Sequence, residues 1–255
     1  MTTTPENAPP RTAIVTGATS GIGEASARAL YEVGHKVLLT GRSLATGEAL
    51  AADLGPRARF VAADLTSANS AQHVVRAAYA FGGGLDVLVN NAGIDHTGDL
   101  LTTPMDTVRA VFETNTFASL AMLQAAGALM KKRGGGSIIN ITSRLASIGV
   151  PSMSIYAASK GAVLALTRSA AVELAPYNIR VNAVAPGMTR TPLFEAWAAE
   201  QSDPAGAARS AAAGIPLGRL AEARDVASAV VYLASDAAAY LTGISLPVDG
   251  GYTAT

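Results

Sequence analysis

The sequence predicts an α/β protein in which one doubly wound parallel sheet carries helices on both faces. Short β-rich apolar runs alternate with segments of helical spacing along the whole chain, which is typical of a parallel sheet. Right-handed crossovers between parallel strands then place helices on both sides. A glycine-rich turn joins the first strand to the first helix, and no linker-like stretch or fixed-period repeat is visible. We therefore expect one domain over residues 11–255.

The first half of the chain contains four predicted strands, over 12–16, 36–40, 59–63 and 85–89. Between them, apolar residues recur at helical spacing over 22–33, 44–54 and 67–81. Gly34 is placed to end the first helix, and the glycine triplet 82–84 is placed to end the third.

The second half begins with a long predicted helix over about 104–130, with Pro104 near its start. A second glycine triplet, 134–136, precedes the next strand and is interpreted as helix-stop and turn material. The remaining elements follow in order. They are a strand over 137–142, a helix over 153–175, a strand over 179–184, a polar, alanine-rich excursion over 188–213, a helix over 224–235 and a strand over 244–248.

Composition narrows the possible functions. The 255 residues carry a net charge of zero and are 49% hydrophobic, which allows a sizeable core and gives no attraction to nucleic acid. The absence of cysteine excludes disulfides and thiolate chemistry, and it fits a cytoplasmic protein. Residues 1–10 lack the apolar centre of a secretory signal and are expected to be a disordered tail. No apolar run is long enough for a membrane span.

The glycine turn after the first strand predicts a nucleotide site. Gly17, Gly21 and Gly23 would let backbone N–H groups approach a pyrophosphate, whose charge the N-terminus of the following helix favours. The spacing is G-x-x-x-G-x-G and departs from the general dinucleotide pattern G-x-G-x-x-G. A tight turn without a ligand is the alternative interpretation.

The end of the second predicted strand indicates which dinucleotide would bind. An acidic residue there would bind the free ribose hydroxyls of NAD, but this chain has Gly41 followed by Arg42. A guanidinium suits a 2′-phosphate, so the sequence favours NADP(H) over NAD(H). A solvated surface arginine is the alternative.

A tyrosine, a lysine and a serine form a candidate catalytic group. Tyr156 and Lys160 are four residues apart, so a helix would place the phenol and the ammonium on one face. A free phenol has a pKa near ~10, and an adjacent ammonium is expected to lower it. Ser143, just after a predicted strand, could hold a carbonyl oxygen while the tyrosine delivers its proton. Taken alone, such a pair also occurs by chance.

Several motifs in order resemble the short-chain dehydrogenase/reductase family, from about residue 11 to 252. They are Thr16–Gly23, Asp64 with Leu65, Asn90–Gly93, Asn115, Ser143, Tyr156 with Lys160, Pro186 and Gly187 with Thr191, and Asp249–Gly251. The resemblance implies a Rossmann-type fold of about seven strands in the order 3-2-1-4-5-6-7. It also implies hydride transfer between NADP(H) and a ketone or secondary alcohol.

The resemblance implies a role for each matching residue. Tyr156 would be the general acid or base, with Lys160 lowering its pKa and bonding the nicotinamide ribose. Ser143 would orient the substrate oxygen. Asn115, expected inside the long helix, would hold a water that connects the lysine to solvent; an ordinary surface amide is the alternative. The expected cofactor-binding residues are Gly17, Thr19, Ser20, Gly21, Ile22, Gly23, Arg42, Ser43, Asp64, Leu65, Asn91, Ala92, Gly93, Tyr156, Lys160, Pro186, Gly187, Thr189 and Thr191.

The substrate is less well specified. Candidate substrate contacts are His96, Arg144, Met153, Met188, Phe194 and Trp197. The excursion that contains the last two would be a lid, but its apolar residues could equally form a packed surface or a subunit contact. His96 has the alternative of a polar loop residue, and His35 and His73 are expected on the surface.

Other functions stay open. A 3-oxoacyl thioester reductase competes with a reductase of small ketones, and an acyl carrier partner would need a basic patch near the site. Arg109 and Lys131–Arg133 are available for such a patch, without a sign that they converge. An NADP-sensing binding protein is the alternative of another class. No metal site is expected, since His and Cys clusters are lacking. The resemblance also implies a homotetramer built on the two long helices and the last strand.

Overall fold

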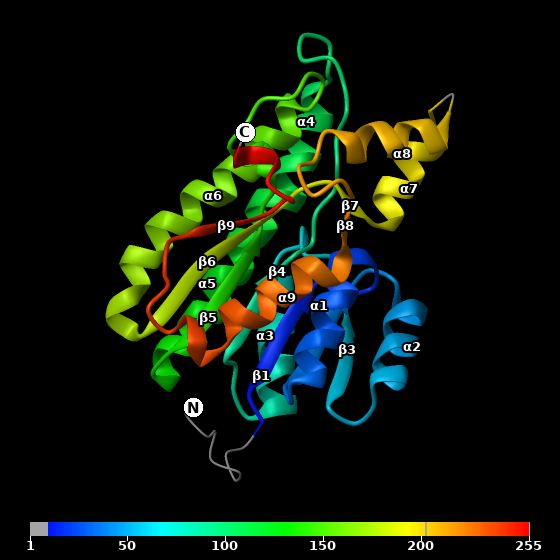
Figure 1. Cartoon of the computed structure of the whole chain (residues 1–255). Helices are drawn as coiled ribbons and strands as arrows, with labels where there is room; N and C mark the ends of the chain where they lie inside the picture. The colour runs from blue at the N-terminus through cyan, green and yellow to red at the C-terminus, as the bar shows by residue number, and fades with distance from the viewer. Residues whose placement is uncertain (1–9, 202, 255) are drawn as a thin grey trace.

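The computed structural model describes residues 10–201 and 203–254, without the side chains of residues 193, 204 and 205. The expected tail, residues 1–10, lies outside this part of the chain except for its last residue. Seven parallel strands form the main sheet of the described residues, in the order β3-β2-β1-β4-β5-β6-β9 (Figure 1). This confirms the predicted order 3-2-1-4-5-6-7. The last strand carries the label β9 because two short strands, which form a separate sheet, precede it in sequence. The strands are β1 (Thr12–Thr16), β2 (Lys36–Gly41), β3 (Ala58–Ala62), β4 (Val87–Asn90), β5 (Gly136–Ile141), β6 (Ile179–Pro186) and β9 (Ser245–Val248).

Alternation along the strands divides the core into two layers. In β1, Ala13 and Val15 point into one apolar cluster and Ile14 points into the other, and all three are fully buried. In β4, Val89 and Leu88 are divided in the same way. Both faces are therefore covered, which explains why these strands read as continuous apolar runs.

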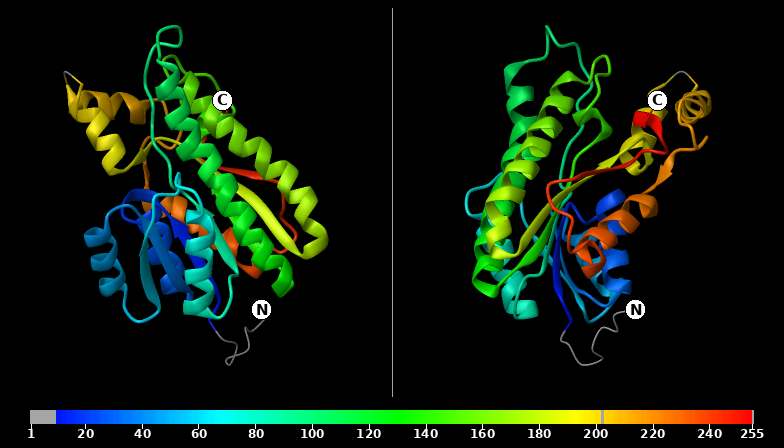
Figure 2. Two further views of the ribbon diagram at one scale, coloured as in Figure 1. Left: turned by 180° about the vertical axis from the view of Figure 1, so that it is seen from behind. Right: turned by 60° about the vertical axis from the view of Figure 1, so that its left-hand side comes forward.

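Two helical layers cover the two faces of the sheet (Figure 2). The first cluster is closed by α1 (Gly21–Glu32), α2 (Leu44–Leu54) and α9 (Ala223–Ala234). The second is closed by α3 (Ser70–Gly82), α5 (Ala118–Arg133) and α6 (Ser154–Leu174). Gly83 and Gly134 end α3 and α5 in the left-handed conformation, as the glycine triplets predicted.

The long helix expected over 104–130 is not continuous. It consists of α4 (Met105–Phe112), a π-helical turn over Glu113–Phe117, and α5. Asn115 lies in this turn and is fully buried. A π turn holds one more residue than an α turn, and a single extra residue is too small a change for apolar periodicity to detect.

The excursion after β6 forms two helices, α7 (Pro192–Ala199) and α8 (Pro204–Ala213), above the carboxyl ends of the strands (Figure 1). Both begin with proline, and the side chains of Thr191 and Asp203 accept a backbone N–H at their N-termini. The short strands β7 (Thr189–Arg190) and β8 (Ala221–Glu222) pair beneath them.

The surface position expected for His35 is wrong, because this side chain is only 8% exposed. The residue follows α1, where its backbone carbonyl accepts from the guanidinium of Arg57 at 2.8 Å. Burial, and next the charge of Arg11, lowers the pKa of His35. His73 is exposed on α3, as expected.

Candidate active site

The glycine turn between β1 and α1 packs directly against the segment after β4. Gly17 has φ +60°, and a Cβ there would lie 2.9 Å from Cα of Ala92. A Cβ on Gly23 would collide with the carbonyl of Gly17 and with the side chain of Asn91. Only glycine fits at these two positions, so the turn exposes backbone at the start of α1.

Thr16 and Asn91 hold the turn in place. The Thr16 hydroxyl accepts the backbone N–H of Asn91 at 2.9 Å and that of Ala92 at 3.0 Å. The Asn91 amide donates back to the carbonyls of Thr16 and Gly17, at 2.9 and 3.1 Å. The turn is therefore fixed at the place where the strand order reverses between β1 and β4, which is where open α/β sheets bind ligands.

A cavity of about 1240 Å³ extends from the glycine turn across the carboxyl ends of the strands to α7. Its size and position fit a dinucleotide together with a small substrate. Most of the predicted site residues line it. These are Gly17, Thr19, Ser20, Gly21, Ile22, Arg42, Asp64, Leu65, Asn91, Ala92, Gly93, Ser143, Arg144, Met153, Tyr156, Lys160, Pro186, Gly187, Met188, Thr189, Thr191, Phe194 and Trp197.

Four predicted site residues are not part of the cavity lining. Gly23 supports the turn from behind, and Ser43 is exposed at the start of α2, where its hydroxyl bonds that of Thr46. Asn115 is enclosed below the cavity. His96 lies within 3.3 Å of the Thr103 hydroxyl, in the loop between β4 and α4.

Ser143, Tyr156 and Lys160 come together at the centre of the cavity. Ser143 lies close enough to the Tyr156 hydroxyl to lower its pKa, and the Ser143 oxygen accepts the N–H of Leu145 at 3.1 Å. Lys160 Nζ lies 5.8 Å from the centre of the Tyr156 ring and donates to the carbonyl of Ile141 at 2.9 Å. The phenol and the ammonium face the same space from adjacent turns of α6.

The expectation that Lys160 lowers the pKa of Tyr156 is wrong for the protein alone. Burial, and next the carboxylate of Asp95, raises the pKa of Tyr156, while Ser143 acts in the opposite direction. Burial lowers the pKa of Lys160 to about 8, against the pull of Asp95. The ammonium is directed at a backbone carbonyl, whereas the Asp95 charge acts on both groups.

Asn115 joins the loop after β4 to α6. Its oxygen accepts the N–H of Ile94 at 2.8 Å, and its amide donates to the carbonyl of Ile94 at 2.9 Å and to the hydroxyl of Ser159 at 3.0 Å. Ser159 in turn donates to the carbonyl of Tyr156 at 2.7 Å. A Cβ on Gly93 would lie 3.1 Å from the Asn115 oxygen and 3.3 Å from Lys160 Nζ. These contacts fix the backbone on both sides of the catalytic candidates.

Three residues of the site were not predicted from the sequence. Thr16 stands at the start of the glycine-turn motif without an expected role of its own, and Asp95 and Ser159 are not among the expected site residues. For Ser159, its position between the two predicted catalytic residues on one helix was the available signal. The roles of Thr16 and Asp95 depend on contacts between distant strands and loops, which local pattern does not show.

Arg42 lies at the opposite end of the cavity from Tyr156, beside Asp64. Arg42 is exposed, and its charge contributes to the lowered pKa of Asp64, after the hydrogen bonds from Thr66 to that carboxylate. Residues 41–43, at the end of β2, contain no acid.

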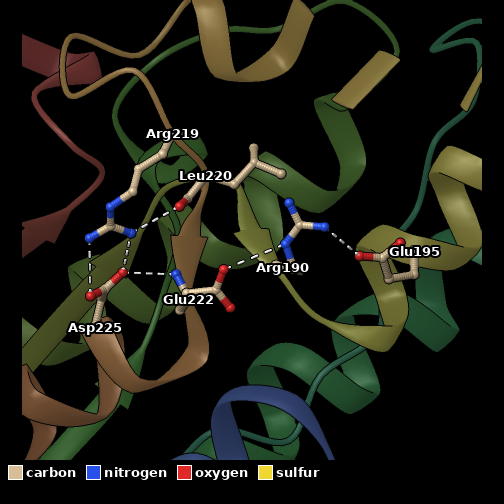
Figure 3. A network of polar contacts seen from close by, with 6 residues as sticks. All are labelled: Arg190, Glu195, Arg219, Leu220, Glu222 and Asp225. Atoms are coloured by element: carbon tan, nitrogen blue, oxygen red, sulfur yellow. Dashed lines mark hydrogen bonds and ion pairs between the residues drawn. The ribbon is translucent and has the colours of Figure 1, made fainter. Parts of the chain in front are cut away.

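Arg190 ties α7 to the strands beneath it (Figure 3). Its guanidinium lies between Glu195 of α7, at 3.2 Å, and Glu222 of β8, at 3.5 Å. Behind it, Arg219 pairs with Asp225 at 2.6 Å. These pairs are exposed and screened by water, so they set the orientation of α7 more than they stabilise it.

Phe194 and Trp197 give α7 an apolar inner face. Their rings lie 5.5 Å apart and pack with Ile215, Leu220 and Tyr252 in a separate small core. The predicted lid is thus a packed unit with its own apolar contacts.

Two features are absent from the described ranges 10–201 and 203–254. No helix there is both long and apolar enough to cross a bilayer. No group of three His, Cys, Asp or Glu side chains there could hold a metal ion.

A parallel sheet with a glycine turn at its switch point and a cavity beside it is the arrangement in which open α/β proteins bind a nucleotide. Comparison with known proteins agrees. The family model described as enoyl-(acyl carrier protein) reductase matches residues 17–253. The chain belongs to the short-chain dehydrogenase/reductase family, whose members use nicotinamide cofactors and act on alcohols and ketones.

Individual relatives cover nearly the whole chain. The cis-4-hydroxycyclohexanecarboxylate dehydrogenase of Sinomonas cyclohexanicum is 42% identical over 247 residues, covering 96% of this chain and 97% of its own. The 3-oxoacyl-(acyl-carrier-protein) reductase of Vibrio cholerae is 37% identical over 241 residues, covering 94% and 96%. A crystal structure from Sinorhizobium meliloti 1021 superposes with a TM-score of 0.91 at 37% identity, covering 97% of this chain and 98% of its own.

Proposed function

We propose that this protein is an NADP(H)-dependent oxidoreductase that interconverts a ketone and a secondary alcohol, with Tyr156 as general acid in reduction and general base in oxidation. The observation that carries the proposal is the meeting of Ser143, Tyr156 and Lys160 in one cavity with the glycine turn. Each supplies what a carbonyl reduction needs, namely a proton, a hydrogen bond to the oxygen, and a nearby positive charge.

The residues along the cavity fit a nicotinamide dinucleotide. At Gly17 and Gly21, positive φ and missing side chains bring bare backbone to the cavity, and a Cβ on Gly21 would close to 3.3 Å from Thr191. The turn would hold the phosphates, Asp64 and Leu65 would border the adenine, and Lys160 and Thr191 would hold the nicotinamide end. A bound nicotinamide supplies the hydride.

The chain's own residues would handle the proton. In reduction the Tyr156 hydroxyl gives its proton to the substrate oxygen while Ser143 keeps that oxygen in place. With its pKa raised in the protein alone, Tyr156 is fully protonated at neutral pH and starts as the acid. The positive charge of Lys160 stabilises the phenolate that forms, and α7 would exclude water from this exchange.

Arg42 supports NADP(H) as the cofactor. It lines the end of the cavity where an adenosine ribose would lie, and no acid at the end of β2 is placed to bind a free 2′-hydroxyl. A guanidinium there would bind a 2′-phosphate through charge-assisted hydrogen bonds.

A free small molecule is the substrate that the surface favours over an acyl carrier protein. Lys131–Arg133 end α5 just before β5 begins, which places them at the edge of the sheet opposite the cavity. Lys131 stacks on Tyr177, and Arg133 donates to the carbonyl of Gly83. Lys131–Arg133 therefore do not converge at the site, and Arg109, on α4, is paired with Asp106 at 2.7 Å. The resemblance to an acyl-carrier-protein reductase keeps a 3-oxoacyl thioester as the second candidate.

A non-catalytic NADP sensor is less well supported. Such a protein needs no proton donor at the nicotinamide end, yet Ser143 and Tyr156 line the cavity together. A homotetramer is part of the proposal, since Phe117 and Val172, on the outer faces of the two long helical segments, are 50% and 77% exposed. Light scattering that gives a monomer would contradict the tetramer.

The test of the proposed function is a panel of ketones and secondary alcohols with NADPH, NADP⁺, NADH and NAD⁺, followed by nicotinamide absorbance. Tyr156→Phe should abolish turnover and leave NADPH binding within about threefold, because only the transferred proton is lost. Tyr240→Phe, at an exposed site, is the matched control and should keep the wild-type rate. A Tyr156→Phe enzyme that retains most of its rate would refute the mechanism.

A further inference from the structure

Arg144 occupies a fixed position in the substrate half of the cavity. It directly follows Ser143 in a short 3-10 turn, Arg144–Ala146, and is one of the residues that line the cavity. Its guanidinium carbon lies 3.8 Å from the centre of the Tyr252 ring. This stacking holds the plane of the guanidinium and leaves its N–H edge for hydrogen bonds.

One nitrogen of that edge has no partner: Nη1 of Arg144 is buried and makes no hydrogen bond within the described part of the chain. The charge of Arg144 helps to lower the pKa of Asp249, after the hydrogen bonds that the oxygens of Asp249 accept from Thr253 and Gly251. A buried charged donor without a partner is costly, so an anion in the cavity that Arg144 lines would gain a charge-assisted hydrogen bond from this side chain.

The other charges of the cavity show where an anion would fit. Lys160 and Arg42 are the other two cations of the described lining. Lys160 is bonded to a carbonyl, and Arg42 lies beside Asp64 at the far end. Asp95 acts electrostatically on Tyr156 and Lys160, which puts a negative charge next to the reacting oxygen. The substrate half therefore holds the opposite charges of Asp95 and Lys160 near Tyr156, with Glu113 as a further acid of the lining and the positive charge of Arg144 in its wall.

We propose that Arg144 binds a carboxylate of the substrate and that the substrates are hydroxy or keto acids whose carboxylate lies several bonds away from the reacting carbon. The inference rests on the proposed function, because it places the carbinol at Tyr156. Arg144 would bind the carboxylate through charge-assisted hydrogen bonds. The charge of Asp95 disfavours 2-hydroxy acids, whose carboxylate would lie beside the reacting centre. A ring or short chain between the carbinol and the carboxylate would place the carboxylate at Arg144 and away from Asp95.

The first experiment compares two substrates of the same shape. The probes are 4-hydroxycyclohexanecarboxylate and its neutral amide, assayed with wild type, Arg144→Met, Arg144→Lys and the control Arg76→Met, at an exposed position on α3. Arg144→Met should lower kcat/KM for the carboxylate by about 30- to 100-fold, mainly through KM, and change that for the amide by less than about threefold. Arg144→Lys should recover part of the loss, and Arg76→Met should behave as wild type.

Equal losses on both probes would show that Arg144 only supports the C-terminal segment, and this would overturn the inference. An unchanged rate on the carboxylate would also overturn it. A wild type that prefers 2-hydroxycyclohexanecarboxylate over the 4-hydroxy acid would contradict the separation that Asp95 imposes.

A binding measurement separates this inference from the proposed function. Calorimetry with cyclohexanecarboxylate, which has no alcohol to oxidise, should show binding to wild type that is at least about tenfold weaker in Arg144→Met. Binding that depends on Arg144 in a protein without turnover would refute the oxidoreductase proposal and leave the carboxylate site standing. Turnover of neutral alcohols, with equal carboxylate binding in wild type and variant, would do the reverse.

Discussion

Replacing Asn115 by alanine should destabilise the protein, because this side chain is a fully buried link between two parts of the site. The change removes three hydrogen bonds, two to the backbone of Ile94 and one to Ser159. Each is worth about 1 kcal/mol net, so the free energy of unfolding should fall by about 3 kcal/mol. In a chain of this length, each kcal/mol lowers Tm by about 2–4 °C, which predicts a loss of about 6–12 °C.

Calorimetric or circular dichroism melting curves would measure this loss. Asn115→Asp is the informative second variant. It keeps the oxygen that accepts the Ile94 N–H, but it replaces the donating amide with an oxygen that faces the Ile94 carbonyl and the Ser159 hydroxyl. Gln124→Ala, at an exposed position on α5, should change the free energy of unfolding by less than about 0.5 kcal/mol. A Tm for Asn115→Ala within about 1 °C of wild type would refute the assignment of these three bonds as stabilising.

Three further predictions concern charge. Arg42→Ala should raise KM for NADPH by about tenfold or more and leave that for NADH nearly unchanged; an unaltered cofactor preference would remove Arg42 from the site. Since burial lowers the pKa of Lys160 to about 8, its ammonium is present below that pH and lost above it. Fluorescence titration should therefore show NADPH binding weakening above about pH 8 in wild type, without such a step in Lys160→Met. The lowered pKa of His35 means that the unfolded chain binds the proton more tightly, so stability is complete above about pH 6.5 and falls as the pH drops below it. Denaturant melts of His35→Leu should lose this slope, and a wild type equally stable at pH 5 and pH 8 would contradict the reasoning.

The order of strands and helices followed from the sequence because it depends on local pattern. Strands buried on both faces are continuous apolar runs, and glycines mark the ends of α3 and α5. The grouping of Ser143 with Tyr156 was expected from the residues and from the family resemblance, and both side chains line the same cavity.

What the sequence did not show depends on contacts between segments that are distant along the chain. His35 is buried next to Arg57, which donates to its backbone carbonyl, and the charge of Arg11 acts on its ring; both arginines are distant from it along the chain. The raised pKa of Tyr156 comes from burial and from Asp95 in the loop after β4, neither of which a Tyr-x-x-x-Lys spacing contains. The stacking of Arg144 on Tyr252 requires the C-terminal turn Tyr252–Ala254 to lie beside the turn Arg144–Ala146, which is far earlier in the chain.

The π turn over Glu113–Phe117 constrains how this chain can change in length. Deleting one residue, such as Thr114, would remove the extra residue and return the turn to ordinary α-helix, so α5 could keep Met122, Ala126 and Met130 inside the second core cluster. The inward position of Asn115, which lies in the turn, would then be lost. The π turn thus places the amide of Asn115 in a bonding position while the apolar stripe of α5 stays in the core. Single-residue gaps between α4 and α5 should therefore be absent from functional variants of this protein.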